Sequence, residues 1–254
     1  MTESPLPSPP ARPRLDRFVS MAALGVAVVA LGVAGWSQMG FDGRVRAYLM
    51  ANPTVLDEVM QARQQAEYAN LFQRITEGVA ANPQLLAADP RDPAVGPEDA
   101  SVVVHQFFDY RCPYCKVLAE PYLALIERHP DVRFVFKEWP ILDGPQDGIS
   151  HYAARAALAA DAQGRYLPVH QALMAADSLD QATVDQALAQ AGVDMAAARA
   201  FMEADTTRRH VQELQAAAAT VGLQGTPTFF VDGRVSETND PAALEQAIVA
   251  AKGG

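Results

Sequence analysis

The sequence contains two cysteines, Cys112 and Cys115, separated by Pro113 and Tyr114. Two thiols at this spacing can alternate between a dithiol and a disulfide, which is the chemistry of thiol–disulfide exchange. A run of strand-forming residues leads into the pair and an amphipathic helix follows it, so Cys112 is expected at a helix N-terminus. Unpaired backbone N–H groups and the helix dipole favour an anion there, and such a position can lower a cysteine pKa from about 8.5 to about 3.5–7.5. The spacing therefore predicts a redox-active centre.

Other uses of the two cysteines are less well supported by the sequence. A structural zinc site normally needs four ligands, and the chain has no second cysteine pair and no ligand-like spacing among its five histidines. Attachment of haem requires a histidine after the second cysteine, where Lys116 stands. A static disulfide remains an alternative, although its loop is too small to add much stability through chain entropy. We expect no metal, and no cofactor beyond the redox-active disulfide Cys112–Cys115.

The overall composition bounds the classes of partner. About half of the residues are apolar, which is enough for a sizeable core. The formal charge of −10 argues against a nucleic-acid partner, because binding to phosphates needs basic patches. The basic residues are mostly scattered, with one short concentration at Arg12, Arg14 and Arg17.

Residues 18–36 follow these arginines as an uncharged apolar stretch. The stretch is longer than the apolar part of a usual signal peptide and about long enough to cross a bilayer. Arginines on its N-terminal side would keep residues 1–17, a disordered tail, in the cytoplasm and send the rest of the chain outward. We expect a transmembrane anchor, with a signal segment cleaved near Ala34 as the alternative. Both options place the protein on the periplasmic side of the inner membrane, where disulfides persist.

Residues 37–91 predict a helical stalk. Asn52 and Pro53 form a strong helix start. Small or apolar residues then recur at spacings of mostly three and four, which match one face of a long helix, at Val55, Val59, Ala62, Ala66, Ala69, Phe72, Ile75 and Val79. Such a stripe must be buried, either on the next domain or by self-association into a coiled-coil-like stalk. We expect a homo-oligomer through residues 44–80, followed by a linker over residues 89–99 and a domain over residues 92–254.

That domain alternates strands and helices. Residues 101–108 predict a strand, a helix carries the cysteines to about residue 129, and residues 132–137 predict a second strand, parallel to the first. An Ala-rich helical insertion occupies about residues 148–222. Residues 227–231 predict a strand, Asp232-Gly233 a hairpin turn, and residues 241–251 a last helix. The fold class is therefore α/β.

Three sequence motifs occur in this order, at residues 107–116, 138–142 and 225–233. Together they resemble the DsbA-like branch of the thioredoxin superfamily over about residues 92–252. The resemblance implies a thioredoxin-like fold with a helical insertion, preceded here by an N-terminal apolar helix and an α-helical stalk. The stalk resembles, more loosely, the N-terminal region of the oligomeric ScsC group.

The resemblance also implies roles for individual residues. Cys112 would be the exposed nucleophile and Cys115 the deeper resolving thiol, while Pro113 and Tyr114 would tune the thiolate. Thr226-Pro227 is similar to the cis-proline loop that faces the cysteines and pairs with the substrate backbone. The sequence by itself says only that an X-Pro bond permits cis at modest cost.

One position departs from the family pattern. Many members carry a buried glutamate six residues before the first cysteine, which is thought to move protons at the buried thiol. Gln106 stands there, and an amide cannot accept that proton. Glu138, at the end of the neighbouring strand, could act as the proton relay, or it could simply be solvated.

The resemblance implies an exported thiol:disulfide oxidoreductase that forms or rearranges disulfides in unfolded or cysteine-containing protein substrates, with a membrane or periplasmic redox partner. Oxidase and isomerase or reductase stay open, because Cys112-Pro113-Tyr114-Cys115 does not settle the direction of electron flow. Two alternatives from other classes remain. The thiolates could hold Cu(I), or the protein could be a tethered chaperone or scaffold of the envelope.

Overall fold

The structure is a computed structural model that describes residues 15–144 and 146–253. The expected cytoplasmic tail therefore lies almost wholly outside the described residues. Internal contacts divide the chain into two compact units, Met1–Glu67 and Tyr68–Gly254. Each unit is described by itself below.

The described part of the first unit, residues 15–67, is mainly helical. Helix α1 (Leu15–Ala51) is followed by Asn52, whose side-chain amide donates to the Tyr48 carbonyl at 2.9 Å. Helix α2 (Thr54–Ala81) begins just after Pro53. The expected helix start at Asn52-Pro53 is thus confirmed. Large apolar side chains of this unit are exposed, among them Val59 and Met60.

Residues 18–36, the expected transmembrane anchor, lie within α1. The side chains at both ends of this stretch, residues 18–22 and 32–36, lie outside the described residues. In the part of the chain that the structure describes, no helix is long and apolar enough to cross a membrane, so the expected anchor is not supported.

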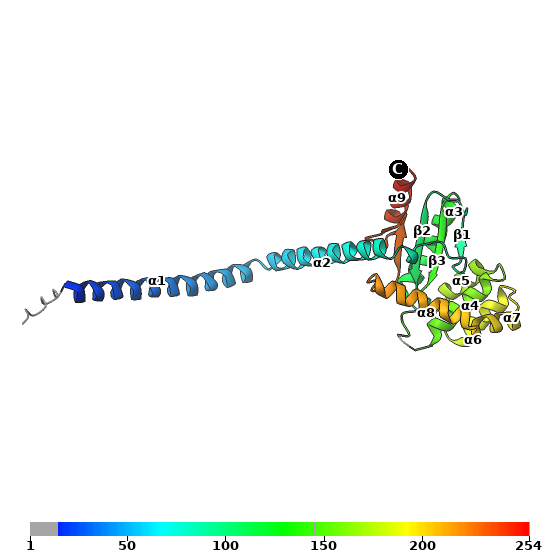
Figure 1. The fold of residues 1–254 in the computed structure, drawn as a ribbon, viewed down its shortest axis with the longest axis horizontal. Coiled ribbons are helices and arrows are strands. Elements are labelled where there is room, and N and C mark those ends of the chain that lie inside the picture. Colours follow the sequence, from blue (N-terminus) through cyan, green and yellow to red (C-terminus); the bar gives the residue numbers. More distant parts are fainter. Residues whose placement is uncertain (1–14, 145, 254) are drawn as a thin grey trace, which may run out of the picture. The chain divides into compact units, whose positions relative to one another are not determined.

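The second unit is built on a five-stranded sheet of order β1-β3-β2-β4-β5. Figure 1 labels β1, β2 and β3 of this sheet. Strands β2 and β3 are parallel and all other neighbours are antiparallel, as the sequence predicts for the two strands around the cysteine helix. The strands are β1 (Ala94–Val95), β2 (Val103–Phe108), β3 (Arg133–Glu138), β4 (Thr228–Val231) and β5 (Arg234–Val235).

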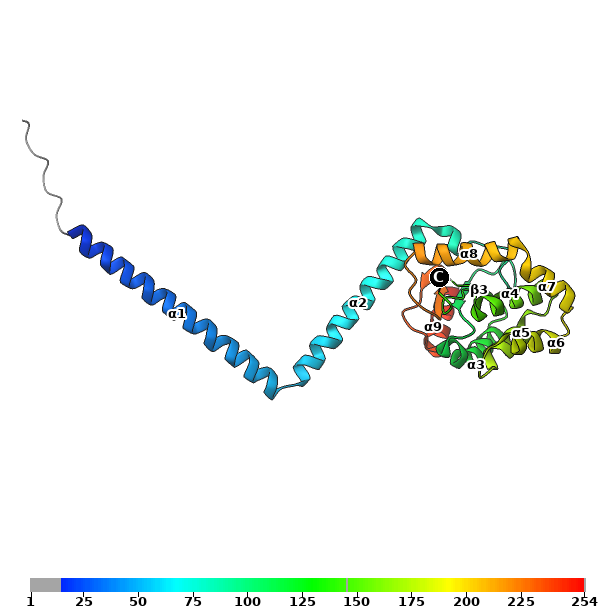
Figure 2. The same ribbon diagram turned by 90° about the horizontal axis from the view of Figure 1, so that it is seen from below.

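Helices complete the unit. The expected insertion is confirmed as α4 to α8, which lie together beside the sheet in Figures 1 and 2. Helix α3 follows the cysteine motif and α9 closes the chain. The helices are α3 (Pro113–Arg128), α4 (Ile149–Asp161), α5 (Tyr166–Ala175), α6 (Gln181–Gln190), α7 (Met195–Glu203), α8 (Asp205–Thr220) and α9 (Pro241–Lys252), with a short 3-10 turn η1 (Pro83–Leu85).

The two faces of the sheet have separate cores, because successive side chains of a strand point to opposite faces. Phe108, Phe136 and Phe229 belong to the larger core, which also contains side chains of α3, α4 and α9. Phe107 and Phe230 belong to the smaller core on the other face. Burial of each of these rings stabilises the fold by roughly 1.5–3 kcal/mol.

The smaller core takes part of its cover from the end of α2. Ile75, Val79 and Leu85 are buried in it, beside Leu214 of α8. The approach is close, because a Cβ added at Gly78 would lie 3.0 Å from the Cα of Val221. The compact unit therefore begins at Tyr68 rather than at residue 92, the boundary expected from the sequence.

The expected linker is also bound to this unit. Residues 94–95 form β1, and the carboxylate of Asp92 is buried against the Lys137 ammonium. His210 Nε2 of α8 lies 3.0 Å from the other oxygen of Asp92. A charge buried this deeply is tolerated only with a partner, so these contacts fix the segment to β3 and α8.

Replacing Asp92 should therefore destabilise the second unit strongly. Asp92→Asn leaves the Lys137 ammonium buried without its counter-charge, and we expect a loss of about 3–5 kcal/mol in the free energy of unfolding, measured by urea titration. Arg199→Gln, which breaks the more exposed pair with Asp185, is the control and should cost less than about 1 kcal/mol. Equal effects of the two changes would contradict a buried ion pair at Asp92.

Candidate functional site

Cys112 stands at the N-terminal cap of α3, where the sequence predicts it. Pro113 takes the first helical position, which lacks a partner for an N–H in any case. The backbone N–H of Cys112 donates to the Asp109 carbonyl at 3.0 Å, which closes the turn between β2 and the helix. Both cysteines are free thiols.

The expected exposure of Cys112 is wrong. Only 4% of its surface is exposed, and Cys115 is fully buried. The cover comes from the loop before β4, because the Cys112 thiol donates to the backbone carbonyl of Thr226 at 3.1 Å. A substrate sulfur would therefore approach Cys112 at the edge of this loop.

The two sulfurs have opposite electrostatic environments. A hydrogen bond from the Cys115 thiol lowers the pKa of Cys112 from 9.0 to about 6, helped by the Thr226 side chain and by the backbone N–H groups of Cys115 and Tyr114, against the effect of burial. Burial raises the pKa of Cys115 far above its ordinary value. Near neutral pH, Cys112 is thus the thiolate and Cys115 the thiol, which is the division of roles that the resemblance implies.

The Thr226–Pro227 peptide bond is cis. The structure brings this loop against Cys112 although 114 residues separate Thr226 from it in the chain. Tyr114 and Val117 lie on the outer side of the α3 start and are 73% and 76% exposed. A polypeptide at Cys112 would therefore meet a carbonyl on the loop and two exposed apolar side chains on the helix.

Glu138 is completely buried, so its interpretation as a solvated residue at a strand end is wrong. Its Oε1 accepts hydrogen bonds from the hydroxyls of Tyr110 and Tyr166, each at 2.9 Å. The Nδ1 of His170 lies 3.1 Å from the Tyr110 hydroxyl. Burial raises the pKa of Glu138 well above 4.5 and lowers that of His170 to about 3, so burial favours the neutral form of both groups.

This cluster does not contact either cysteine by a hydrogen bond among the described residues. The proton-relay role of Glu138 stays a prediction. Gln106 is buried in the sheet, and its side-chain oxygen has no hydrogen-bond partner among the described residues. The Gln106 amide does not titrate, so it cannot accept a proton from Cys115.

Sequence reasoning missed the residues that hold the turn before Cys112. The Asp109 carboxylate is buried and accepts three hydrogen bonds, from the backbone N–H groups of Arg111 and Leu142 and from the Ser150 hydroxyl. Arg111 also pairs with Asp143 at 2.9 Å. An Asp two residues before a backbone N–H is a common turn signal, but its two distant donors leave no trace in the sequence.

Lys116 is a second residue whose contacts the sequence did not indicate. Its ammonium donates to carbonyls at the end of α5, with the Ala176 oxygen at 2.6 Å and the Leu173 oxygen at 3.2 Å. A cation at a helix C-terminus satisfies carbonyls that lack helical partners. Lys116 thereby joins the cysteine helix to the insertion.

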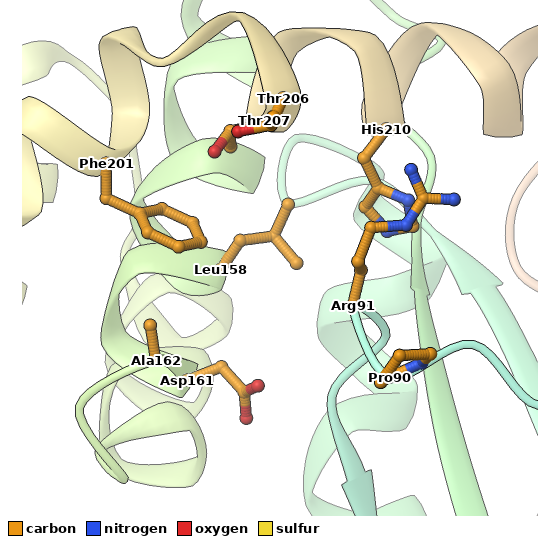
Figure 3. A pocket seen from close by; sticks show the side chains of 9 residues that line it. All are labelled: Pro90, Arg91, Leu158, Asp161, Ala162, Phe201, Thr206, Thr207 and His210. Carbon is orange, nitrogen blue, oxygen red and sulfur yellow. The ribbon is translucent and has the colours of Figure 1, made fainter.

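A separate cavity of about 270 Å³ lies away from the cysteines (Figure 3). Its lining comes from Pro90 and Arg91, from Leu158 and its neighbours on α4, and from α7 and α8. Arg91 is held by Asp89 and Glu213 rather than directed at a free ligand. Neither cysteine lines this cavity, so it is not part of the redox site.

The arrangement of a cysteine-capped helix, a central parallel strand pair and a cis-proline loop can be compared with known proteins. A family model described as thioredoxin matches residues 88–250, which is more than half of the chain. The chain belongs to the thioredoxin family. Within this family it is similar to ScsC, and a model of the copper resistance protein ScsC N-terminal domain matches residues 41–69.

Solved structures agree with this thioredoxin-family membership. A thioredoxin-like oxidoreductase from Silicibacter pomeroyi is 35% identical, with a TM-score of 0.59 over 65% of this chain and 95% of that chain. ScsC of Proteus mirabilis, in a transitional conformation, is 26% identical, with a TM-score of 0.60 over 84% of this chain and 94% of that one.

The curated relatives are longer proteins, and this chain matches only part of the length of each. The Na⁺/H⁺ antiporter NhaA 3 of Salinispora tropica is 32% identical over 155 residues, which is 59% of this chain and 23% of that protein. The chain spans about a quarter of the length of the curated relatives that it matches.

The low pKa of Cys112 predicts a measurable pH dependence. In the reduced protein, thiolate absorbance should rise with a midpoint near pH 6, and Cys112→Ser should remove this step while Cys115→Ser keeps a thiolate at Cys112. A single step near pH 9 in the unchanged protein would contradict the assignment.

The same shift links pH to stability. Because the folded pKa of about 6 lies below the ordinary 9.0, the thiolate stabilises the folded state at high pH, and this contribution is lost as pH falls through about 6. The reduced protein should therefore gain stability relative to Cys112→Ser between about pH 6 and pH 9, measured by urea unfolding under reducing conditions. A stability difference that is flat over this interval would count against a shifted thiolate.

Proposed function

We propose that this protein is a thiol–disulfide oxidoreductase that forms or rearranges disulfides in cysteine-containing proteins. The observation that carries the proposal is the split between the two sulfurs: the pKa of Cys112, whose sulfur lies 3.1 Å from the Thr226 carbonyl oxygen, is lowered to about 6, and the pKa of the fully buried Cys115 is raised. A static disulfide would not need the low pKa of Cys112. Tyr114 and Val117 would supply apolar contact to a protein substrate, because both lie exposed next to Cys112.

The exchange would proceed through a mixed disulfide. The Cys112 thiolate attacks one sulfur of a substrate disulfide, and the other substrate sulfur leaves as a thiolate. Cys115 then loses its proton and attacks Cys112, which releases the second substrate sulfur and closes the Cys112–Cys115 disulfide. Two electrons pass to the substrate, and oxidation of a substrate dithiol is the same sequence in reverse.

The direction of electron flow depends on whether a partner protein re-oxidises or re-reduces the two cysteines after each exchange. A stabilised Cys112 thiolate favours the reduced form, which makes the disulfide a stronger oxidant. Alkylation trapping in growing cells measures the redox state of Cys112 and Cys115. A largely oxidised pair indicates an oxidase, and a largely reduced pair indicates an isomerase or reductase.

We propose an extracytoplasmic, periplasmic location, which the likeness to ScsC and the arginines before residue 18 support.

Binding of Cu(I) by the two thiolates is a second candidate, and the match of residues 41–69 to a domain named for copper resistance favours it. That match does not include the cysteines. The strongly raised pKa of Cys115 also works against a second thiolate ligand. Stoichiometric Cu(I) on the reduced protein without any disulfide exchange would favour this candidate.

Single cysteine variants test the proposed exchange. Cys112→Ala should abolish reduction of insulin, because it removes the attacking thiolate. Cys115→Ala should instead form a mixed disulfide with the substrate that cannot resolve, visible as a reductant-sensitive band of higher mass. Full activity after replacement of both cysteines by serine would leave only the scaffold alternative.

We also propose self-association through the first unit. Its apolar side chains, such as Leu56, Val59 and Met60, are exposed in the single chain. The expected segment of residues 44–80 must end earlier, because Ile75 and Val79 are buried in their own chain's second unit. The remaining segment agrees with the family match over residues 41–69.

Truncation tests the self-association. A chain that begins at Asp42 should exceed the monomer mass in light scattering, and a chain that begins at Tyr68 should be a monomer. The second cut keeps Ile75, Val79 and Leu85, so the smaller core stays covered. Monomer mass for both chains would rule out the proposed segment.

A further inference from the structure

A groove of about 480 Å³ lies between the cysteine helix α3 and helix α5, which pack against each other (Figure 2). Its floor is apolar. Ala119 and Met174 are buried there, and the partly buried Leu123 packs against the larger core. The exchange chemistry at the two sulfurs does not by itself use this surface, so the groove is open to a separate role.

The groove begins one helical turn from Cys112. Four of its lining residues follow Cys112 at intervals of four, four, three and four residues, namely Lys116, Glu120, Leu123 and Glu127. Residues at these intervals share one face of a helix, so the face that starts at the cysteine continues along the groove. A polypeptide whose sulfur reaches Cys112 can therefore lay its neighbouring residues in the groove.

The side of the groove formed by α3 carries two carboxylates. Glu120 and Glu127 are exposed, and neither has an ion pair or a side-chain hydrogen bond within the described part of the chain. The lining also contains the Lys116 ammonium, which donates to the carbonyls of Leu173 and Ala176 at the end of α5. A bound polypeptide would therefore meet two unpaired negative charges, which complement basic side chains.

Helix geometry sets the positions at which these basic side chains should occur. Glu120 and Glu127 follow Cys112 by eight and fifteen residues, which is roughly 12 Å and 22 Å along the helix axis at about 1.5 Å per residue. An extended chain rises about 3.3 Å per residue, so it covers these distances in roughly four and seven residues.

We infer that the groove between α3 and α5 binds the segment next to the reactive cysteine of a protein substrate. It selects extended segments with basic side chains at about the fourth and seventh residues from that cysteine and with apolar side chains between them. The inference rests on the proposed function and adds a class of substrate to it. Because exposed ion pairs are individually weak, the preference acts mainly on the rate at which substrates associate.

Matched peptides test this preference in the reduced, full-length protein. Each peptide has one cysteine and is joined by a disulfide to a second copy of itself, so attack on either sulfur gives the same mixed disulfide. One peptide carries arginine at the fourth and seventh residues from the cysteine, with leucine between, and the other carries glutamate in place of arginine. Acid quenching at successive times gives the rate at which the mixed disulfide forms.

We expect the arginine peptide to react about five- to thirtyfold faster at low salt, because two exposed ion pairs replace two like-charge contacts. Both peptides are made with the test residues before the cysteine and with the test residues after it. The advantage should occur in one of these two orders, which gives the direction of the bound segment. Equal rates for arginine and glutamate in both orders would overturn the inference.

Variants of the protein assign the preference to the groove. Glu120→Gln combined with Glu127→Gln should bring the ratio of the two rates to within about twofold of one, and lysine at both positions should reverse it. This ratio cancels any change in the reactivity of Cys112, which both peptides share. Glu98→Gln combined with Glu237→Gln is the control, because it makes the same change in net charge at exposed residues outside the groove. An equal fall in the ratio for this control would show attraction by net charge alone and would contradict the groove.

A change of position gives a second control. A peptide of the same composition, with its arginines at the eleventh and twelfth residues from the cysteine, extends past the end of α3 at Arg128 and should lose the advantage. The advantage should also decrease in about 1 M salt, where the screening length is about 3 Å. An advantage that does not depend on the position of the arginines would argue against binding in the groove.

The behaviour of the unchanged protein separates this inference from the proposed function. If no disulfide-bonded peptide forms a mixed disulfide with Cys112, the proposed function fails. If all the peptides form it at equal rates, the proposed function stands and only the role of the groove fails.

Discussion

The contrast between two sulfurs within one helical turn is the constraint on which the site depends. Cys112 must keep enough donors to remain an anion, while Cys115 must stay in the core as a thiol. A helix start at the end of a central strand meets both demands, because its first N–H groups face outward and its next turn faces the sheet. The Thr226 loop then limits access to the first sulfur, so reactivity comes with partial cover rather than full exposure.

The helical insertion contributes to this arrangement as well as enlarging the domain. Ser150 bonds to the turn before the cysteines, and Tyr166 and His170 surround the buried Glu138. Lys116 reaches back from the cysteine helix to the end of α5. The insertion and the sheet therefore share buried polar contacts, and such contacts tolerate little displacement because an unpaired buried group is costly. The cysteine helix is consequently held from two sides.

The sequence predicts the parts of this site that depend on local pattern. The strand before Cys112, the parallel strand pair, the insertion and the loop at Pro227 all carry signals of composition or spacing, and all are present. The long-range contacts of Asp109 and Glu138 could not be predicted, because these partners lie 28 to 41 residues away and any polar side chain nearby could have served. The packing of the end of α2 on the sheet could not be predicted for a related reason. The stripe of Ile75 and Val79 shows that a helix face is buried, but not which surface buries it.

The cover that α2 gives to the smaller core has a consequence for how such domains can be joined to other proteins. The family match begins at residue 88, yet Phe107, Trp139 and Phe230 need Ile75, Val79 and Leu85 over them. A gene fusion that carried only the matched residues would expose this face of the sheet and invite aggregation. A fusion that keeps this core covered must therefore begin near Tyr68, which lies inside α2. The sequence joined to it must either continue that helix or supply a helix N-terminus there.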